Sequence, residues 1–152
     1  MTEFRVETIA SQHAAVVRAD VPQVELAGVF HRAFQEVVQV AGAQGVGITG
    51  PPFGYYPRMP AATVEVAAGF PVSAPITPVG EVTPMELPGG RVTTGIHVGS
   101  FDGLATTYQE LMQWAAAEGH ELAGYMWESY LSDPAAEPDS STWRTLITWP
   151  LA

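Results

Sequence analysis

The sequence predicts an α+β domain that contains the same unit twice, each copy in the order strand, helix, strand, strand. The main observation is an internal repeat. Shifted by 74 residues, FQEVVQVAGAQGVGITGPPFGYY (34–56) aligns without a gap on YQELMQWAAAEGHELAGYMWESY (108–130), with eight of the 23 positions identical. An amphipathic helix in each copy and short apolar or alternating segments around it are the second and third observations. We expect one domain over residues 1–152, with repeats at about 13–70 and 85–150.

Both expected helices carry the same apolar stripe. The matching pairs are Phe30/Leu104, Phe34/Tyr108, Val37/Leu111, Val38/Met112 and Ala41/Ala115. Their spacing of i, i+4, i+7, i+8 and i+11 marks one face of an amphipathic helix. The first helix is expected over 22–43, with Pro22 in its first turn and Gly45 beyond its end. The second is expected to begin at Ser100 or Asp102 and to end at Gly119.

Strands are expected on both sides of each helix. In the first copy they are HAAVVRADV (13–21), FGYY (53–56) and ATVEVAAGF (62–70), and in the second RVTTGIHV (91–98), YMWESYL (125–131) and TWRTLITWPL (142–151). Between the copies, PVSAPITPVGEVTP (71–84) holds four prolines and is expected to cross the surface without regular structure. LPGGR (87–91) has the composition of a hairpin turn. Two copies related by a pseudo-two-fold axis bury a shared seam, and a groove along it is the natural ligand site.

Composition and charge restrict the class of protein. Apolar residues make up 47% of the chain, and the absence of cysteine excludes disulfides, thiolate metal sites and cysteine nucleophiles. The sequence has no apolar run long enough for a membrane span and no signal-peptide pattern at its start, so we expect a cytoplasmic protein. Six basic residues against 16 acidic ones argue against nucleic-acid binding. The formal charge of −10 favours cationic or neutral ligands.

Glu128 stands out within AGYMWESYLSDP (123–134), because the residues around it are typical of a sheet interior. An ionised carboxylate in such surroundings is costly unless something compensates it. Alternation along a strand places Glu128 on the same face as Met126 and Tyr130. If that face met solvent, Met126 and Tyr130 would form an exposed apolar stripe, which usually marks a binding site. We therefore expect Glu128 to be the carboxylate of the groove.

The remaining candidate residues are mostly aromatic. The repeat makes Gly54 the mate of Glu128, so only one copy offers a carboxylate. The candidate ligand-binding set is Glu128, Tyr130, Met126, Trp127, Phe53, Tyr55 and Tyr56. Alternation does not decide which member of each neighbouring pair faces the groove. The four histidines, His13, His31, His97 and His120, lack metal-ligand spacing, and the Gly-rich segment 42–50 follows a helix rather than a strand, so neither a metal nor another cofactor is expected.

Three segments carry a family resemblance: GPPFGYY (50–56), MWESYLSDP (126–134) and WRTLITWPL (143–151). In this order over two repeats, from about residue 5 to 151, the sequence resembles the GyrI-like family. These small-molecule-binding domains are similar to the gyrase inhibitory protein and to the effector domains of some AraC-class and MerR-class regulators. The resemblance implies a curved antiparallel sheet, two helices on one side and a ligand groove between the repeats. It also implies a central glutamate among aromatic residues, and the matching positions are Glu128 and Tyr130.

The resemblance implies a class of function as well. The 152 residues contain no helix-turn-helix, so the chain resembles the stand-alone members. We expect multidrug-type binding of flat, lipophilic, cationic small molecules, for sensing, sequestration or resistance, with Glu128 facing the positive charge. One alternative is a hydrolase in the same groove, in which Glu128 acts as the catalytic residue and activates a water that opens the cyclopropane ring of a DNA alkylator. The other is an inhibitor that contacts DNA gyrase.

Overall fold

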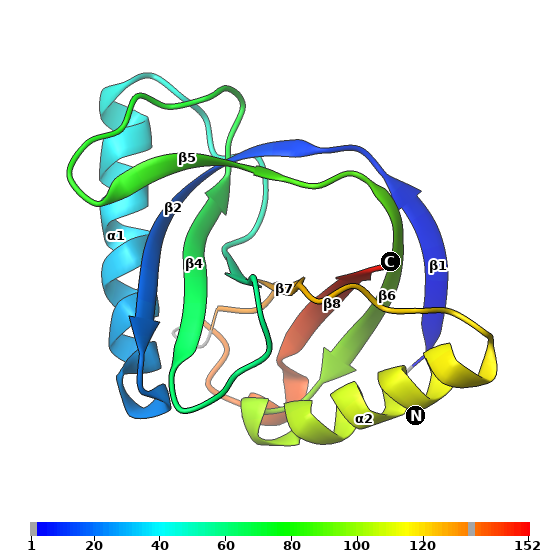
Figure 1. Ribbon diagram of the computed structural model, residues 1–152. Helices are drawn as coiled ribbons and strands as arrows, with labels where there is room; N and C mark the ends of the chain where they lie inside the picture. Colours follow the sequence, from blue (N-terminus) through cyan, green and yellow to red (C-terminus); the bar gives the residue numbers. More distant parts are fainter. Residues whose placement is uncertain (1–2, 134–135) are drawn as a thin grey trace.

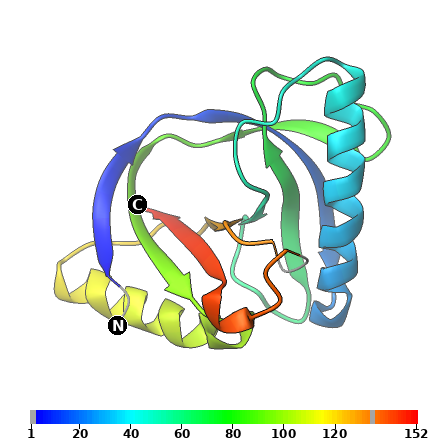
Figure 2. The same ribbon diagram turned by 180° about the vertical axis from the view of Figure 1, so that it is seen from behind.

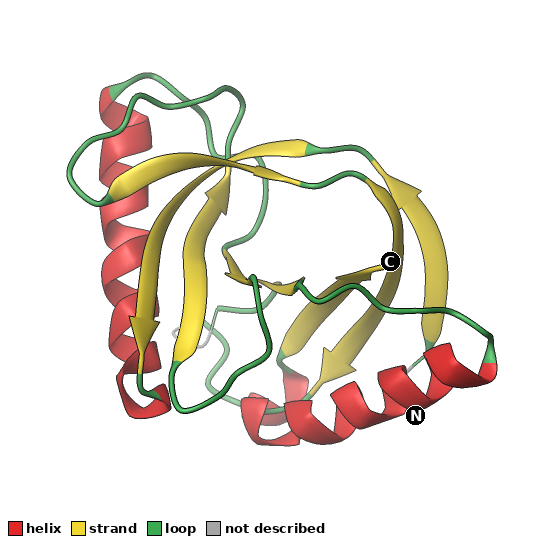
Figure 3. Cartoon of the chain, viewed as in Figure 1, coloured by secondary structure: helices red, strands yellow, loops and turns green. Residues whose placement is uncertain are grey.

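One antiparallel sheet of eight strands, in the order β1-β6-β8-β7-β3-β4-β2-β5, organises the chain (Figures 1 and 3). This computed structural model describes residues 3–133 and 136–152, so Pro134 of the MWESYLSDP segment lies outside the described residues. The strands are β1 (Phe4–Ile9), β2 (Gln12–Val21), β3 (Phe53–Tyr56), β4 (Val64–Pro71), β5 (Val82–Leu87), β6 (Gly90–Val98), β7 (Met126–Tyr130) and β8 (Arg144–Pro150), and the helices are α1 (Leu26–Ala43) and α2 (Leu104–Ala117). The predicted α+β class is confirmed.

Two similar halves meet at the centre of the sheet. In the first half β3 lies beside β4 and β4 beside β2, and in the second β7 lies beside β8 and β8 beside β6. The two halves join where β3 pairs with β7, and this register places Gly54 directly opposite Glu128. Since Gly54 is also the repeat mate of Glu128, the pseudo-two-fold axis passes between these two residues.

The two helices follow most of the predicted stripe, although its members Val38 and Met112 are exposed. Val37 and Ala41 of α1 and Leu111 and Ala115 of α2 are buried. Each helix follows a short 3-10 turn, and α1 has 18 residues against 14 in α2, which gives the first copy about one additional turn. The glycines two residues beyond the helix ends have positive φ, as is common where a helix stops. None of the helices in the described part of the chain is long and apolar enough to cross a membrane.

Two further strands, β1 and β5, are not expected from the sequence, and they link the halves. The registers Ile9↔Gly90 and Gln12↔Leu87 continue one another, so residues 4–21 and 82–98 form one bent antiparallel ribbon. The prediction of a hairpin turn at 87–91 is therefore wrong, because β5 pairs with β2 and not with β6. A Cβ on Gly89 would lie 2.6 Å from the Ser11 nitrogen, so this glycine serves the close contact at the bend.

The proline-rich segment 71–84 follows the prediction only in part, because residues 82–84 belong to β5, and Val72, Ile76 and Val82 are buried. Residues 74–78 have no regular secondary structure. Pro71 ends β4, and Pro84 lies in β5 at the edge of the sheet, where a missing backbone donor is tolerated.

The sheet is strongly curled, with both helices outside the curl (Figures 1 and 2). Under α1, the buried side chains of Val37 and Ala41 contact Ala68 of β4, and under α2, Leu111 contacts Met126 and Ile147. The opposite, concave face is filled by a separate cluster that includes Phe53 and Trp127. The helices therefore cover one face only, as predicted, and they leave the central strands β3 and β7 to form the floor between them.

Candidate functional site

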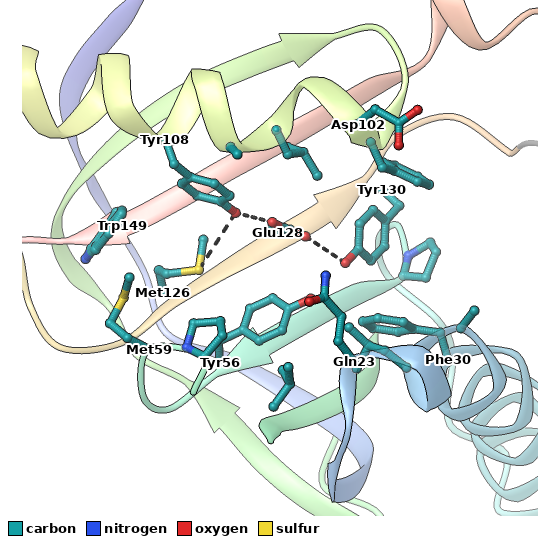
Figure 4. Close-up of a pocket in the computed structure, with 18 of the residues that line it drawn as sticks. Gln23, Phe30, Tyr56, Met59, Asp102, Tyr108, Met126, Glu128, Tyr130 and Trp149 are labelled. Atoms are coloured by element: carbon teal, nitrogen blue, oxygen red, sulfur yellow. Dashed lines mark hydrogen bonds between the residues drawn. The ribbon is translucent and has the colours of Figure 1, made fainter. Parts of the chain in front are cut away.

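A cavity of about 1380 Å³ lies between α1 and α2, above the central strands (Figure 4). Its wall is largely apolar, with rings contributed by both halves: Phe30, Phe34, Tyr56, Phe70, Tyr108, Tyr130 and Trp149. This volume exceeds the range of roughly 300–1,000 Å³ that is typical of sites for drug-sized ligands. The cavity lies along the seam between the repeats, where the sequence places the expected ligand groove.

Glu128 lies on the floor of this cavity with only 6% of its surface exposed. The Tyr130 hydroxyl donates a hydrogen bond of 2.8 Å to its Oε1, and the Tyr108 hydroxyl donates to its Oε2 (Figure 4). The Tyr108 oxygen also lies 3.9 Å from Sδ of Met126. Tyr108 comes from α2 and Tyr130 from β7, so two elements of the second repeat position the carboxyl group.

Burial raises the pKa of the Glu128 carboxyl above its usual range, and the hydrogen bonds from Tyr108 and Tyr130 lower it in part. Burial likewise raises the pKa of the Tyr108, Tyr130 and Tyr56 hydroxyls, and the nearby carboxylate raises them further. These phenols therefore stay protonated at neutral pH. Tyr108 and Tyr130 act as neutral hydrogen-bond donors that stabilise the ionised form of Glu128.

None of the ion pairs in the described part of the chain includes the Glu128 carboxylate. The nearby His97 imidazole lowers the pKa of Glu128 less than either tyrosine hydrogen bond does. Arg58 lines the cavity, yet its guanidinium pairs with Asp20 and Glu65, in each case at 3.3 Å. Asp102 adds a further carboxylate at the exposed margin of the cavity. The site is therefore an aromatic cavity with a buried acid that two tyrosine hydroxyls hydrogen-bond and that forms no ion pair among the described residues.

Within the described ranges, no group of three or more His, Cys, Asp or Glu side chains is placed to bind a metal ion. The two hydroxyls on Glu128 are hydrogen-bond donors rather than metal ligands. A buried carboxyl group can attract a positively charged ligand or transfer a proton.

The predicted site residues divide between the two faces of the sheet. Met126, Glu128, Tyr130 and Tyr56 line the cavity. Phe53, Tyr55 and Trp127 do not line it; they belong to the cluster on the concave face, where the rings of Tyr55 and Trp127 lie 6.1 Å apart. The strand alternation that sets Glu128 on one face sends these three side chains to the other.

Several cavity residues, among them Tyr108, Phe30 and Trp149, are not predicted as ligand residues from the sequence. Phe30 and Tyr108 belong to the apolar stripes of the helices, and Trp149 to the last strand, so all three resemble ordinary core. One signal does mark Tyr108: it replaces Phe34 of the other copy and brings a hydroxyl into an otherwise apolar stripe.

Known protein structures share this fold. No curated protein matches the sequence. The C-terminal domain of EcmrR superposes with a TM-score of 0.84 at 22% identity, covering 100% of this chain and 98% of that domain. In an EcmrR–DNA complex the match covers 99% of this chain but only 57% of the EcmrR chain.

Two further structures share the fold at lower identity. A hydrolase from Listeria innocua has a TM-score of 0.66 at 14% identity, with 99% of this chain and 92% of that chain covered. SAV2435 bound to tetraphenylphosphonium has a TM-score of 0.69 at 13% identity, with 99% and 94% covered. The sequence model of the GyrI-like small molecule binding domain matches residues 2–152. The chain therefore belongs to the GyrI-like family of small-molecule-binding domains.

Proposed function

We propose that the protein binds lipophilic aromatic cations in the cavity between its helices, with Glu128 as the counter-charge. The observation that carries this proposal is a buried carboxyl group that forms no ion pair among the described residues, at the floor of an aromatic cavity. A bound cation supplies the missing partner, and aromatic faces add about 0.5–2 kcal/mol of cation–π attraction. The shared fold of SAV2435, which is seen with tetraphenylphosphonium, supports the ligand class. In the cell we infer sensing or sequestration of such compounds in the cytoplasm.

The cavity favours charged ligands selectively because its acid is desolvated. A carboxylate in water gains little from a nearby cation, since solvent screens the interaction. Behind aromatic side chains, the same pair interacts more strongly, and the ligand removes the cost of an unpaired buried charge. Tyr108 and Tyr130 keep the carboxylate oriented while the site is empty. A neutral ligand of the same shape gains the apolar contacts but not this charge pair.

The affinity for a cation should depend on pH. Because burial raises the pKa of Glu128, part of the protein carries a neutral carboxyl group above the usual titration range, and only the ionised form attracts a cation. We expect affinity for methyltriphenylphosphonium to rise with pH through the raised pKa and then to level off. Triphenylphosphine oxide, its neutral three-ring analogue, should bind equally well throughout. Calorimetric titration across pH checks this, and a flat profile for the cation would contradict it.

The same raised pKa determines how the stability of the folded protein changes with pH. The carboxyl binds its proton more tightly in the folded state than in the unfolded state. The stabilisation that this tighter proton binding adds to the free energy of unfolding is therefore fully present below the unfolded-state pKa of the carboxyl. This stabilisation is lost as pH rises from there through the folded-state pKa.

Removal of the Tyr108 hydroxyl should weaken binding of the cationic ligand and leave binding of the neutral ligand unchanged. Tyr108→Phe deletes one donor to the carboxylate, which destabilises the ionised form and moves the pH profile of cation binding to higher pH. At neutral pH we expect affinity for methyltriphenylphosphonium to fall by about 2- to 13-fold, as for loss of a typical hydrogen bond with a net value of about 0.5–1.5 kcal/mol. Tyr55→Phe removes a hydroxyl on the concave face and serves as the matched control. An unchanged pH profile in Tyr108→Phe would rule out this role.

A second candidate function uses the same residues as a hydrolase. The observation in its favour is the raised pKa of the Glu128 carboxyl, which suits a general base or acid near neutrality. The Listeria innocua hydrolase of similar fold is consistent with it. Incubation with a cyclopropane-bearing alkylator should then yield a ring-opened product heavier by one water. In this case Glu128→Gln should retain binding and lose turnover by about 10²–10⁴-fold.

A further inference from the structure

Gly54 occupies an unusual position, because it is both the repeat mate of Glu128 and its direct cross-strand neighbour. Opposite residues of an antiparallel pair point to the same face, with Cβ atoms about 4.5–5.5 Å apart. A side chain at position 54 would therefore point into the cavity beside the Glu128 carboxyl. Two identical copies would set two carboxylates against each other here, and like charges directly opposite are unfavourable. At this point of the fold, the two copies have to differ.

The space above Gly54 is filled by the ring of Phe30 from α1. A Cβ placed on Gly54 would lie 2.8 Å from both Cε1 and Cζ of Phe30 and 3.1 Å from the Tyr130 hydroxyl oxygen. The Phe30 ring also makes an edge contact with Tyr130, with centroids 5.7 Å apart, and it lies 5.7 Å from Phe34 (Figure 4 shows Phe30 and Tyr130). The closeness of Phe30 to the floor of the cavity therefore depends on the missing side chain.

The two halves of the site thus have complementary roles. In the second half, α2 brings the Tyr108 hydroxyl to the carboxyl group of Glu128. In the first half, α1 brings the Phe30 ring, which carries no polar atom, to Gly54. The result is one acid facing one aromatic wall across the pseudo-two-fold axis.

We propose that Gly54 is a positioning and specificity-determining residue: by lacking a side chain, it lets Phe30 stand across from Glu128 and shapes the cavity for ligands that surround one positive centre with several aromatic rings. The inference rests on the proposed function and adds a determinant of ligand shape. An added methyl group at position 54 pushes the free end of the Phe30 ring toward the open cavity. Because φ of Gly54 is not positive, the backbone itself accepts alanine.

The test is Gly54→Ala, with Gly42→Ala as the control. Gly42 lies in α1 outside the cavity lining, and a Cβ there has no heavy atom within 4 Å. Gly54→Ala should lower affinity for methyltriphenylphosphonium and for triphenylphosphine oxide by about tenfold each, because overpacking displaces the aromatic wall. Benzyltrimethylammonium, a one-ring cation, should lose less than about twofold, as should all three compounds in Gly42→Ala. The melting temperature reports whether each variant is folded.

A double-mutant cycle with Phe30→Ala makes the assignment specific. If Gly54 acts by placing Phe30, Gly54→Ala should have no further effect once the ring is removed. Unchanged binding in Gly54→Ala, or an effect that persists in full in the Phe30→Ala background, would overturn the inference. The proposed function would be contradicted by a different result, namely that Glu128→Gln changes affinity for charged and for neutral ligands by the same factor. The two failures are separable, because Gly54→Ala acts on both kinds of three-ring ligand.

Discussion

Glu128→Gln is expected to weaken binding of methyltriphenylphosphonium by about 10- to 100-fold, since loss of one partner of a buried charge pair is costly. Binding of triphenylphosphine oxide should stay within about twofold, because glutamine preserves the shape of the site. The free energy of unfolding of the mutant should equal or exceed that of the wild type. The charge that is removed lies buried without an ion-pair partner among the described residues. Calorimetric titration and urea denaturation of wild type and mutant measure both effects.

Asp102→Asn provides the matched control for charge. Asp102 lines the same cavity, but it is exposed to solvent, so its loss should change affinity for the cation by less than about threefold. A general reduction of negative charge would affect both variants alike. If Glu128→Gln binds the charged and the neutral compound as the wild type does, Glu128 is not the functional carboxylate.

Gly69→Ala is expected to lower the free energy of unfolding by more than about 4 kcal/mol, the range reserved for severe steric defects. Gly69 lies in β4 beside β2, and a Cβ there would be 1.9 Å from the Ala15 carbonyl oxygen and 2.8 Å from its carbon. The obstructing atoms are backbone, so no rotation of a side chain relieves the clash. The two strands would have to separate where they form the first half of the sheet. Urea denaturation, followed by circular dichroism, measures the loss.

Gly28→Ala tests whether this cost is specific to the contact. Gly28 lies in α1 and a Cβ there meets no heavy atom within 4 Å, so alanine should stabilise the protein by about 0.5–1 kcal/mol through helix propensity. A Gly69→Ala variant within about 1 kcal/mol of the wild type would show that β2 and β4 do not approach each other this closely.

The sequence predicts the elements that have a strong period of their own. The stripes that begin at Phe30 and Leu104 give both helices, and FGYY matches β3 residue for residue. The strands β1 and β5 have no comparable signal. Phe4–Ile9 alternates only weakly between buried and exposed positions, and β5 contains Pro84. Both strands are specified by their long-range pairing in the ribbon, which a local pattern does not contain.

The candidate site was predictable where alternation and charge act together. Glu128 is conspicuous because a carboxylate is rare among strand aromatics, and its face carries Met126 and Tyr130 with it. Which face of β3 joins that floor depends on the register Gly54↔Glu128, a tertiary fact. From the sequence, Phe53 and Tyr55 were therefore as good candidates for the cavity as Tyr56, although their side chains lie on the concave side. Tyr108 reaches the carboxyl group only because α2 lies beside β7.

The bent ribbon of residues 4–21 and 82–98 makes this chain comparable to a strand-exchanged dimer tied into a single polypeptide. Each half gives an outer strand to the other: β1 completes the edge beside β6, and β5 completes the edge beside β2. The amino-terminal strand finds its partner only after residues 90–98 have been synthesised, so the second half closes the structure that the first begins. Neither copy has a finished edge without the other, so we expect the central cavity to form only when both copies have folded together.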